Sequence, residues 1–337
     1  MSKTYFFFLA LILQHIWVYG QFEPVQTLSV QQQLYNPSFF GLNARSQAGI
    51  TYNKIKISDT DIVNTRYAFG SYSFDEQSFS LGLDFRTFEN GSLGLNTNFT
   101  RLSFVYQLPI NSNWYLLPSL SVDYTHFSLQ SADLILEDQI NILNGFIASR
   151  SIDPLVNTDQ LNQNYFTFSS GMLLHNDRYL FGLSIHQLNR PNVSFSTGTF
   201  EKIPMRIVLQ SIGEWPLNSG RLAYLSDENY FRLYTLFSRE DSNNYARLGE
   251  VLQVGGFHLG LTQSFVSSDQ FRLTTYGLNM GLRIENILLE VQYNLPRNVS
   301  NKAFSPSLFE LSAAFDFLTN RRRTQWNINK AIDTKGY

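Results

Sequence analysis

The sequence contains no cysteine, few charged residues and no long apolar run beyond its N-terminal leader. Without cysteine the chain forms no disulfide, and it has no place for a lipid anchor, which requires a cysteine at the new N-terminus. Charged residues make up 15%, below the roughly 25% of an average soluble domain. After the leader, polar side chains interrupt every apolar stretch, which excludes a transmembrane helix. A membrane protein of this kind must therefore be a β-barrel.

Residues that build catalytic and metal sites are also scarce. The histidines after the leader are His126, His175, His186 and His258, and no two have the spacing of a metal motif. The run from Gly182 to His186 lacks the closing glycine of a nucleophile elbow, so a hydrolase using Ser184 and His186 is only an alternative. The net charge is −2, which gives no reason to expect the basic face that nucleic acid binding usually requires. We predict a non-enzyme with no catalytic residues, metal, cofactor or nucleic-acid partner.

The first twenty residues have the pattern of a secretory signal peptide. A lysine at position 3 is followed by an apolar run from Tyr5 to Leu13, and small or modest side chains precede Gln21. The apolar run is shorter than the roughly 20 residues of a membrane-spanning helix. We expect residues 1–20 to be removed by cleavage near Gln21, which makes the protein an exported one.

Aromatic residues are abundant, with 29 Phe and 18 Tyr, and they recur at every second position. From Phe309 to Phe317 one face carries Phe, Leu and Ala while the other carries Glu310, Ser312 and Asp316. Such alternation is typical of strands with two different faces. The polar face is mostly Gly, Ser, Asn and Gln, as in a barrel lumen, whereas a soluble sandwich would show Lys, Glu and Thr.

The connections between these segments alternate in length, as in outer-membrane barrels. Short turns are expected at Asp75–Gln77, Ile110–Asn113, His175–Arg178 and Leu217–Gly220, and long loops at Thr87–Asn96, Leu129–Asn164 and Asn189–Pro204. Trp114, Tyr115, Tyr179 and Trp215 adjoin short turns, so we expect them at one membrane interface, where such rings are favoured.

Counting the alternating segments gives about fifteen, and an antiparallel barrel with both ends in the periplasm needs an even number. We expect Arg221–Leu225 and Phe231–Phe237 to form one long strand, which gives about fourteen strands; twelve and sixteen are alternatives. The predicted protein is an all-β, antiparallel, transmembrane outer-membrane β-barrel. Its parts are a signal peptide (1–20), a periplasmic N-terminal segment (21–45), the barrel (46–317) and a basic periplasmic tail (318–337).

Two stretches carry a resemblance to a known family. The run Gln32-Gln33-Leu34-Tyr35-Asn36-Pro37-Ser38-Phe39-Phe40-Gly41, followed by Ala48 to Tyr52, resembles the opening of the PorP/SprF family of the type IX secretion system of Bacteroidetes. The stretch from Ser305 through Glu310 to Phe317 resembles its final strand. The resemblance implies a barrel that anchors secreted cargo or a surface adhesin, in gliding bacteria among others, or an accessory subunit of the translocon. A passive channel or hydrophobic-solute transporter is a further alternative.

Three sets of residues are candidate sites. Asn36, Pro37 and Gly41 form either a partner contact or the turn that leads into the first strand. The apolar residues of the longest loop, Leu134, Ile135, Leu136, Ile140 and Leu143, form either a partner surface or a lid over the barrel. Inward charges, chiefly Asp84, Arg101, Glu290 and Glu310, form either a gate or an ordinary ion-paired lumen. The expected partners are outer-membrane lipid and a secreted cargo, an adhesin or other type IX secretion components.

Overall fold

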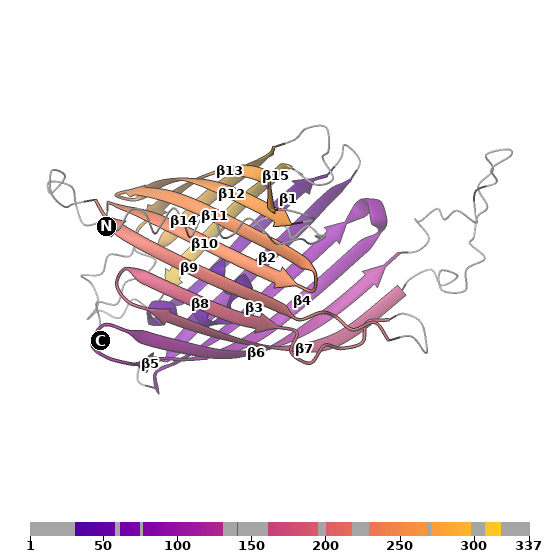
Figure 1. The fold of residues 1–337 in the computed structure, drawn as a ribbon, viewed down its shortest axis with the longest axis horizontal. Helices are drawn as coiled ribbons and strands as arrows, with labels where there is room; N and C mark the ends of the chain where they lie inside the picture. The colour runs from indigo at the N-terminus through magenta and orange to yellow at the C-terminus, as the bar shows by residue number, and fades with distance from the viewer. Residues whose placement is uncertain are drawn as a thin grey trace.

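The computed structural model describes residues 31–57, 61–74, 77–130, 140, 161–194, 200–217, 229–267, 271–297 and 307–317. Within those ranges, no helix has the length and apolar character needed to cross a bilayer. The described strands are antiparallel and tilted, and they form a ring (Figure 1).

The strands follow one another around the ring in chain order. They are β1 (Ser46–Lys56), β2 (Ile62–Phe74), β3 (Phe79–Asn90), β4 (Leu95–Tyr106), β5 (Leu108–Pro109), β6 (Tyr115–Leu129), β7 (Leu161–His175), β8 (Tyr179–His186), β9 (Arg206–Pro216), β10 (Tyr230–Glu240), β11 (Asn243–Val254), β12 (Phe257–Ser267), β13 (Phe271–Ile284), β14 (Ile287–Pro296) and β15 (Ser307–Phe317). The two residues of β5 continue β4 beyond Gln107, and both segments pair with β6. The first and last strands pair from Ser46 opposite Phe317 to Lys56 opposite Ser307, so the barrel is closed with fourteen strands, as predicted.

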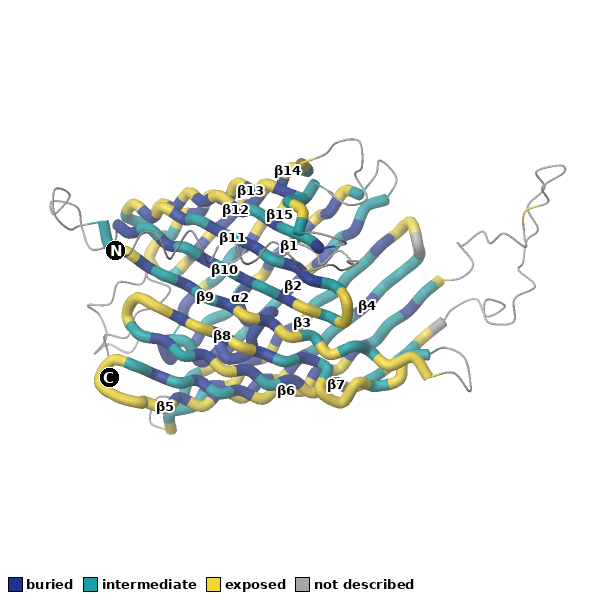
Figure 2. The backbone as a smooth tube through the Cα atoms, viewed as in Figure 1, coloured by how far each residue is buried: buried dark blue, intermediate teal, exposed yellow. Residues whose placement is uncertain are grey.

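The period-two pattern sets which face each residue takes. Buried and exposed residues alternate along the strands (Figure 2). In β3, Leu81, Leu83 and Phe85 are exposed on the outside while Asp84 is buried inside. An apolar outer face is what a bilayer requires, because lipid cannot hydrogen-bond polar groups.

One prediction about the connections is wrong, and another concerns residues that the structure does not describe. The loop expected at Thr87–Asn96 is wrong: β3 and β4 pair as far as Asn90 opposite Leu95, and only residues 91–94, which include the short helix η3 (Gly91–Leu93), join them. The strands continue because their polar side chains also pair, Thr87 Oγ1 donating to Asn98 Oδ1 at 3.0 Å. The expected merging of Arg221–Leu225 with the next segment cannot be followed, since residues 218–228 are not described.

Aromatic side chains form a row on the outside near the short turns. The ring centroids of Tyr179 and Trp215 lie 6.3 Å apart, and those of Trp215 and Phe231 lie 6.1 Å apart. Tyr115 does not join them. It is buried inside the barrel with its ring stacked on His175 at 5.5 Å, because the odd-numbered residues of β6 from Tyr115 to Thr125 face the lumen.

The chain ahead of β1 lies inside the barrel rather than beside it. It comprises α2 (Gln32–Tyr35) and the 3-10 helix η1 (Pro37–Ala44). Every residue from 31 to 44 is buried except the half-buried Leu42. We call residues 31–44 the plug. We expected residues 21–45 in the periplasm. The described part of this segment instead lies in the lumen (Figure 2).

Local chemistry shapes the plug. Proline at the first position of η1 and the Asn36 side chain, which accepts a hydrogen bond from Ser38 N at 3.0 Å, start that helix. Leu42 and Asn43 form a kink inside η1, and the positive φ angles of Asn43 and Ala44, 59° and 47°, turn the chain into β1.

Candidate functional site in the barrel lumen

The plug is fixed to the wall by Asn36, one of the predicted partner contacts. Its Nδ2 donates to Met172 O at 3.2 Å and to Leu183 O at 3.3 Å, which lie on β7 and β8. A Cβ atom at Gly171 would lie 2.4 Å from Asn36 Oδ1, so glycine is needed there for this close approach. The Asn36-Pro37 element is thus an internal contact as well as a turn.

Apolar packing supports the same placement. Phe40 lies over Gly82 of β3, where an added Cβ would come within 2.3 Å of its ring. Gly41 sits against Val105, which would lie 2.6 Å from a Cβ at position 41. Gly41 O also accepts a hydrogen bond from Gln107 Nε2 at 2.8 Å. Gln107 lies where β4 meets the short turns, so this end of the plug occupies the half of the lumen nearer those turns.

Ser184 and His186, the residues of the hydrolase alternative, also bind the plug. Ser184 Oγ donates to Tyr35 O at 2.6 Å, and His186 Nε2 lies 2.8 Å from the same oxygen. The two side chains are 3.2 Å apart, yet both are buried and directed at a backbone carbonyl. A carbonyl oxygen only accepts, so it holds the Nε2 proton in place and leaves Nε2 unable to act as a base toward the serine.

Arg101 joins the plug to the wall at mid-barrel. Its Nε forms an ion pair with Asp123 Oδ1 on β6, and its Nη1 donates to Gln33 O at 3.1 Å and to Leu34 O at 3.4 Å. Asp123 Oδ2 in turn accepts from Ser169 Oγ at 2.8 Å and from Thr167 Oγ1 at 3.3 Å. Asp84 stands directly opposite Arg101 in the pairing of β3 and β4.

The other predicted lumen charges form a separate group on the closing side of the barrel. Glu310 accepts from Gln31 Nε2 of the plug at 3.0 Å and from Asn53 Nδ2 of β1 at 2.9 Å. Glu290 accepts from Asn279 Nδ2 at 3.1 Å and lies 3.5 Å from His258 Nε2. The four predicted charges thus lie in two parts of the ring, Asp84 and Arg101 on β3 and β4, and Glu290 and Glu310 on β14 and β15.

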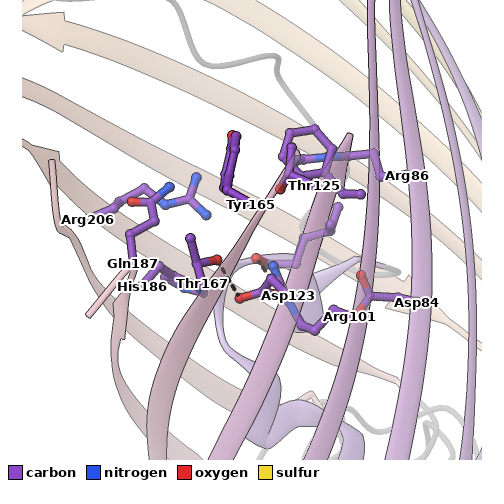
Figure 3. A pocket seen from close by; sticks show the side chains of 12 residues that line it. Asp84, Arg86, Arg101, Asp123, Thr125, Tyr165, Thr167, His186, Gln187 and Arg206 are labelled. Carbon is purple, nitrogen blue, oxygen red and sulfur yellow. Dashed lines mark hydrogen bonds and ion pairs between the residues drawn. The ribbon is translucent and has the colours of Figure 1, made fainter. Parts of the chain in front are cut away.

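A cavity of about 50 Å³ lies between the plug and the wall (Figure 3). Leu34 of the plug lines it, together with wall residues from β3, β4, β6, β7, β8 and β9. These are Asp84, Arg86, Phe99, Arg101, Asp123, Thr125, Tyr165, Thr167, His186, Gln187 and Arg206. Most of the wall residues lie toward the strand ends away from the short turns, which is the outer end of the barrel by the rule for outer-membrane barrels.

Of the loop residues expected to bind a partner, the structure describes only Ile140, whose side chain is 43% exposed. Leu134, Ile135, Leu136 and Leu143 lie outside the described residues. Sequence reasoning missed Gly82, Gly171 and Ser184 as plug contacts, since glycine and serine are common on any lumen wall. In the part of the chain that the structure describes, no cluster of three His, Asp or Glu residues is placed to hold a metal ion.

Comparisons with known proteins bear on this barrel. The family model for "Type IX secretion system membrane protein PorP/SprF" matches residues 21–315. A deltaS2S3 mutant of the TodX monoaromatic hydrocarbon channel matches at a TM-score of 0.50 and 10% identity, covering 89% of this chain and 99% of that one. A Pseudomonas aeruginosa FadL homologue gives 0.49 at 10% identity, covering 91% and 100%. At such identity the likeness concerns the fold alone. Among curated proteins no match was found.

Proposed function

This chain belongs to the PorP/SprF family of type IX secretion system membrane proteins, and on that premise we propose that it is a non-enzymatic barrel that holds an exported protein at the cell surface. It is an outer-membrane component of that secretion system. The observation that best supports an anchoring role is the plug, which fills the lumen with buried side chains and backbone. A filled lumen suits a protein that presents a surface more than one that passes solutes.

The contacts that hold the plug argue against a passive channel. They come from β3, β4, β6, β7, β8 and β15, so they attach the plug around much of the ring. Asn36, Ser38 and Gln31 of the plug each form a side-chain hydrogen bond to the wall. Solute flow would require many of these bonds to break together.

The proposed binding surface is the long outer connection between β6 and β7, residues 130–160. It combines Leu134, Ile135, Leu136, Ile140 and Leu143 with acidic residues. Apolar side chains in a long connection favour packing against a partner. If the bound protein is a motility adhesin, this surface gives the barrel its role in gliding.

Deleting Ser131–Pro154 is expected to release the exported partner from the cells while the barrel still assembles. The pairing of β6 with β7 ends with Leu129 opposite Leu161, so none of the deleted residues belongs to it. Whole-cell immunolabelling of the partner and heat-modifiable gel mobility of the barrel measure the two effects. A matched variant replaces Asp133, Glu137 and Asp138 with the corresponding amides and should retain the partner if the contact is apolar. Full retention after the deletion would contradict the proposed surface.

The identity of the partner follows from affinity purification of the detergent-extracted protein from native membranes, with mass spectrometry of the proteins that copurify. One large exported protein as the main partner supports the anchor. Subunits of the secretion machinery would instead favour an accessory role in the translocon. Conductance in planar bilayers by the unaltered protein would favour a channel.

A further inference from the structure

One carboxylate, that of Glu250, lies on the outside of the barrel among apolar side chains. Glu250 is an outward residue of β11 and stands opposite Leu233 of β10 and Leu261 of β12. The nearest outward residues of its own strand are Leu248 and Leu252. All four outward neighbours of this carboxylate are therefore leucine. In the part of the chain that the structure describes, its side chain forms no hydrogen bond or ion pair.

The depth of Glu250 in the membrane follows from the aromatic row near the short turns. Phe231 of that row stands opposite Leu252, and Glu250 lies two residues farther from the turn between β11 and β12. Two residues along a tilted strand correspond to about 5 Å across the membrane. Glu250 is thus inside the apolar band. A charged side chain there is costly, and such residues usually have a partner that compensates the charge.

The outer face of the neighbouring strands also carries polar side chains. Ser211 of β9 and Thr235 of β10 stand opposite each other facing outward, and their hydroxyl oxygens are 2.7 Å apart. Gln263 of β12 faces outward as well. Small and hydrogen-bonding side chains are typical of contacts between membrane-spanning segments. We call Ser211, Thr235, Glu250 and Gln263 the lateral patch.

We propose that the lateral patch binds a second membrane-spanning protein, whose lipid-facing surface carries a lysine or arginine opposite Glu250. The ion pair compensates the carboxylate, and the two hydroxyls and the Gln263 amide form hydrogen bonds with the partner. Complementary charges in a medium without water give such a contact its specificity. The inference goes beyond the anchoring role, because it concerns the side of the barrel within the bilayer rather than its outer end.

The strands of a second copy of this chain do not supply the required cation. The exposed lysines and arginines of the described strands all lie toward the outer strand ends: Lys54, Lys56, Arg66, Arg239 and Arg272. Two copies side by side in one membrane have these residues at the same depth, which is nearer the cell surface than Glu250. We therefore infer that the partner is a different protein.

The test uses the full-length protein in native outer membranes, with the photo-reactive residue p-benzoylphenylalanine in place of Leu261, beside Glu250, or of Leu83 on β3 as the control position. Irradiation should link position 261, and not position 83, to one other membrane protein. Glu250→Gln removes the charge and keeps the shape, so it should lower the yield of the product about tenfold or more. Glu89→Gln changes an exposed carboxylate on β3 and should leave the yield unchanged.

Two further measurements separate a lost contact from a damaged barrel. Glu250→Leu should be at least as resistant to urea in detergent as the unaltered protein, yet it should abolish the product in membranes. After the linked peptide has located the basic residue of the partner, Glu250→Lys together with a change of that residue to glutamate should restore the product. The proposal is overturned by no product at position 261, a product that survives Glu250→Gln, a link to a second copy of this chain, or a bound ammonium-bearing lipid in place of a protein.

Discussion

Removing residues 31–44 is expected to turn a closed barrel into a conducting one. The plug fills the lumen from the short-turn end to mid-barrel, and its removal leaves inward Ser, Thr, Asn and Gln side chains facing water. The wall should survive, because its strands pair with one another along the whole ring and close through β1 and β15. Single-channel recording in planar bilayers should show discrete conductance steps for the deletion and none for the unaltered protein.

A single methyl group provides a milder form of the same experiment. In Gly82→Ala the added Cβ would lie 2.3 Å from the Phe40 ring, so the plug must shift and brief openings are expected. Gly91→Ala is the matched control, since nothing lies within 4 Å of a Cβ there. If the deletion variant stays silent while its gel mobility shows a folded barrel, residues 31–44 are not what closes the lumen.

The second large effect concerns stability. Asp123→Ala is expected to lower the free energy of unfolding by about 3–5 kcal/mol, because it leaves the buried guanidinium of Arg101 without its carboxylate. It also removes the acceptor of Ser169 and Thr167, which ties β6 to β7. Urea unfolding of the protein in detergent, followed by loss of the heat-modifiable band, gives the difference.

Glu89→Ala is the matched control for Asp123→Ala. Glu89 forms an ion pair with Arg66 at 3.3 Å, but the two side chains are 43% and 63% exposed. Water screens such a pair, so its loss should cost no more than about 1 kcal/mol. Equal effects of the two substitutions would mean that the lumen around Arg101 is as well hydrated as the outer surface.

The strands could be predicted from the sequence because a barrel wall imposes one rule on every residue. Inward and outward positions need different chemistry, so Leu81, Leu83 and Phe85 separate from Asp84 by parity alone. The connections between the strands were harder to predict. The Asn and Thr residues at the ends of β3 and β4 suggest a loop. Beyond the bilayer, however, both faces of a strand are exposed to water, so polar residues can continue the strand pairing.

The plug escaped prediction for a physical reason. Its helices are short, α2 having only four residues, so no periodic pattern marks them. Its three glutamines and Asn36 suggest solvent exposure, although all four are buried and Gln31 and Asn36 are hydrogen-bonded to the wall. The alternation of inward and outward residues also predicted that Asp84 and Glu310 point inward. It does not indicate which strands lie next to one another. Only the ring order separates the group around Arg101 from the group around Glu310.

The position of Glu310 has a consequence for biogenesis. This carboxylate lies on the last strand and binds Gln31 of the plug and Asn53 of the first strand, so it bridges the seam where the ring closes. The strands can pair without the plug, but in the unaltered chain the same carboxylate holds both the seam and the N-terminal segment. We therefore expect the wall to close and the interior to fill together. The outer membrane would then contain no empty pore of this size during insertion, and its permeability barrier would be kept.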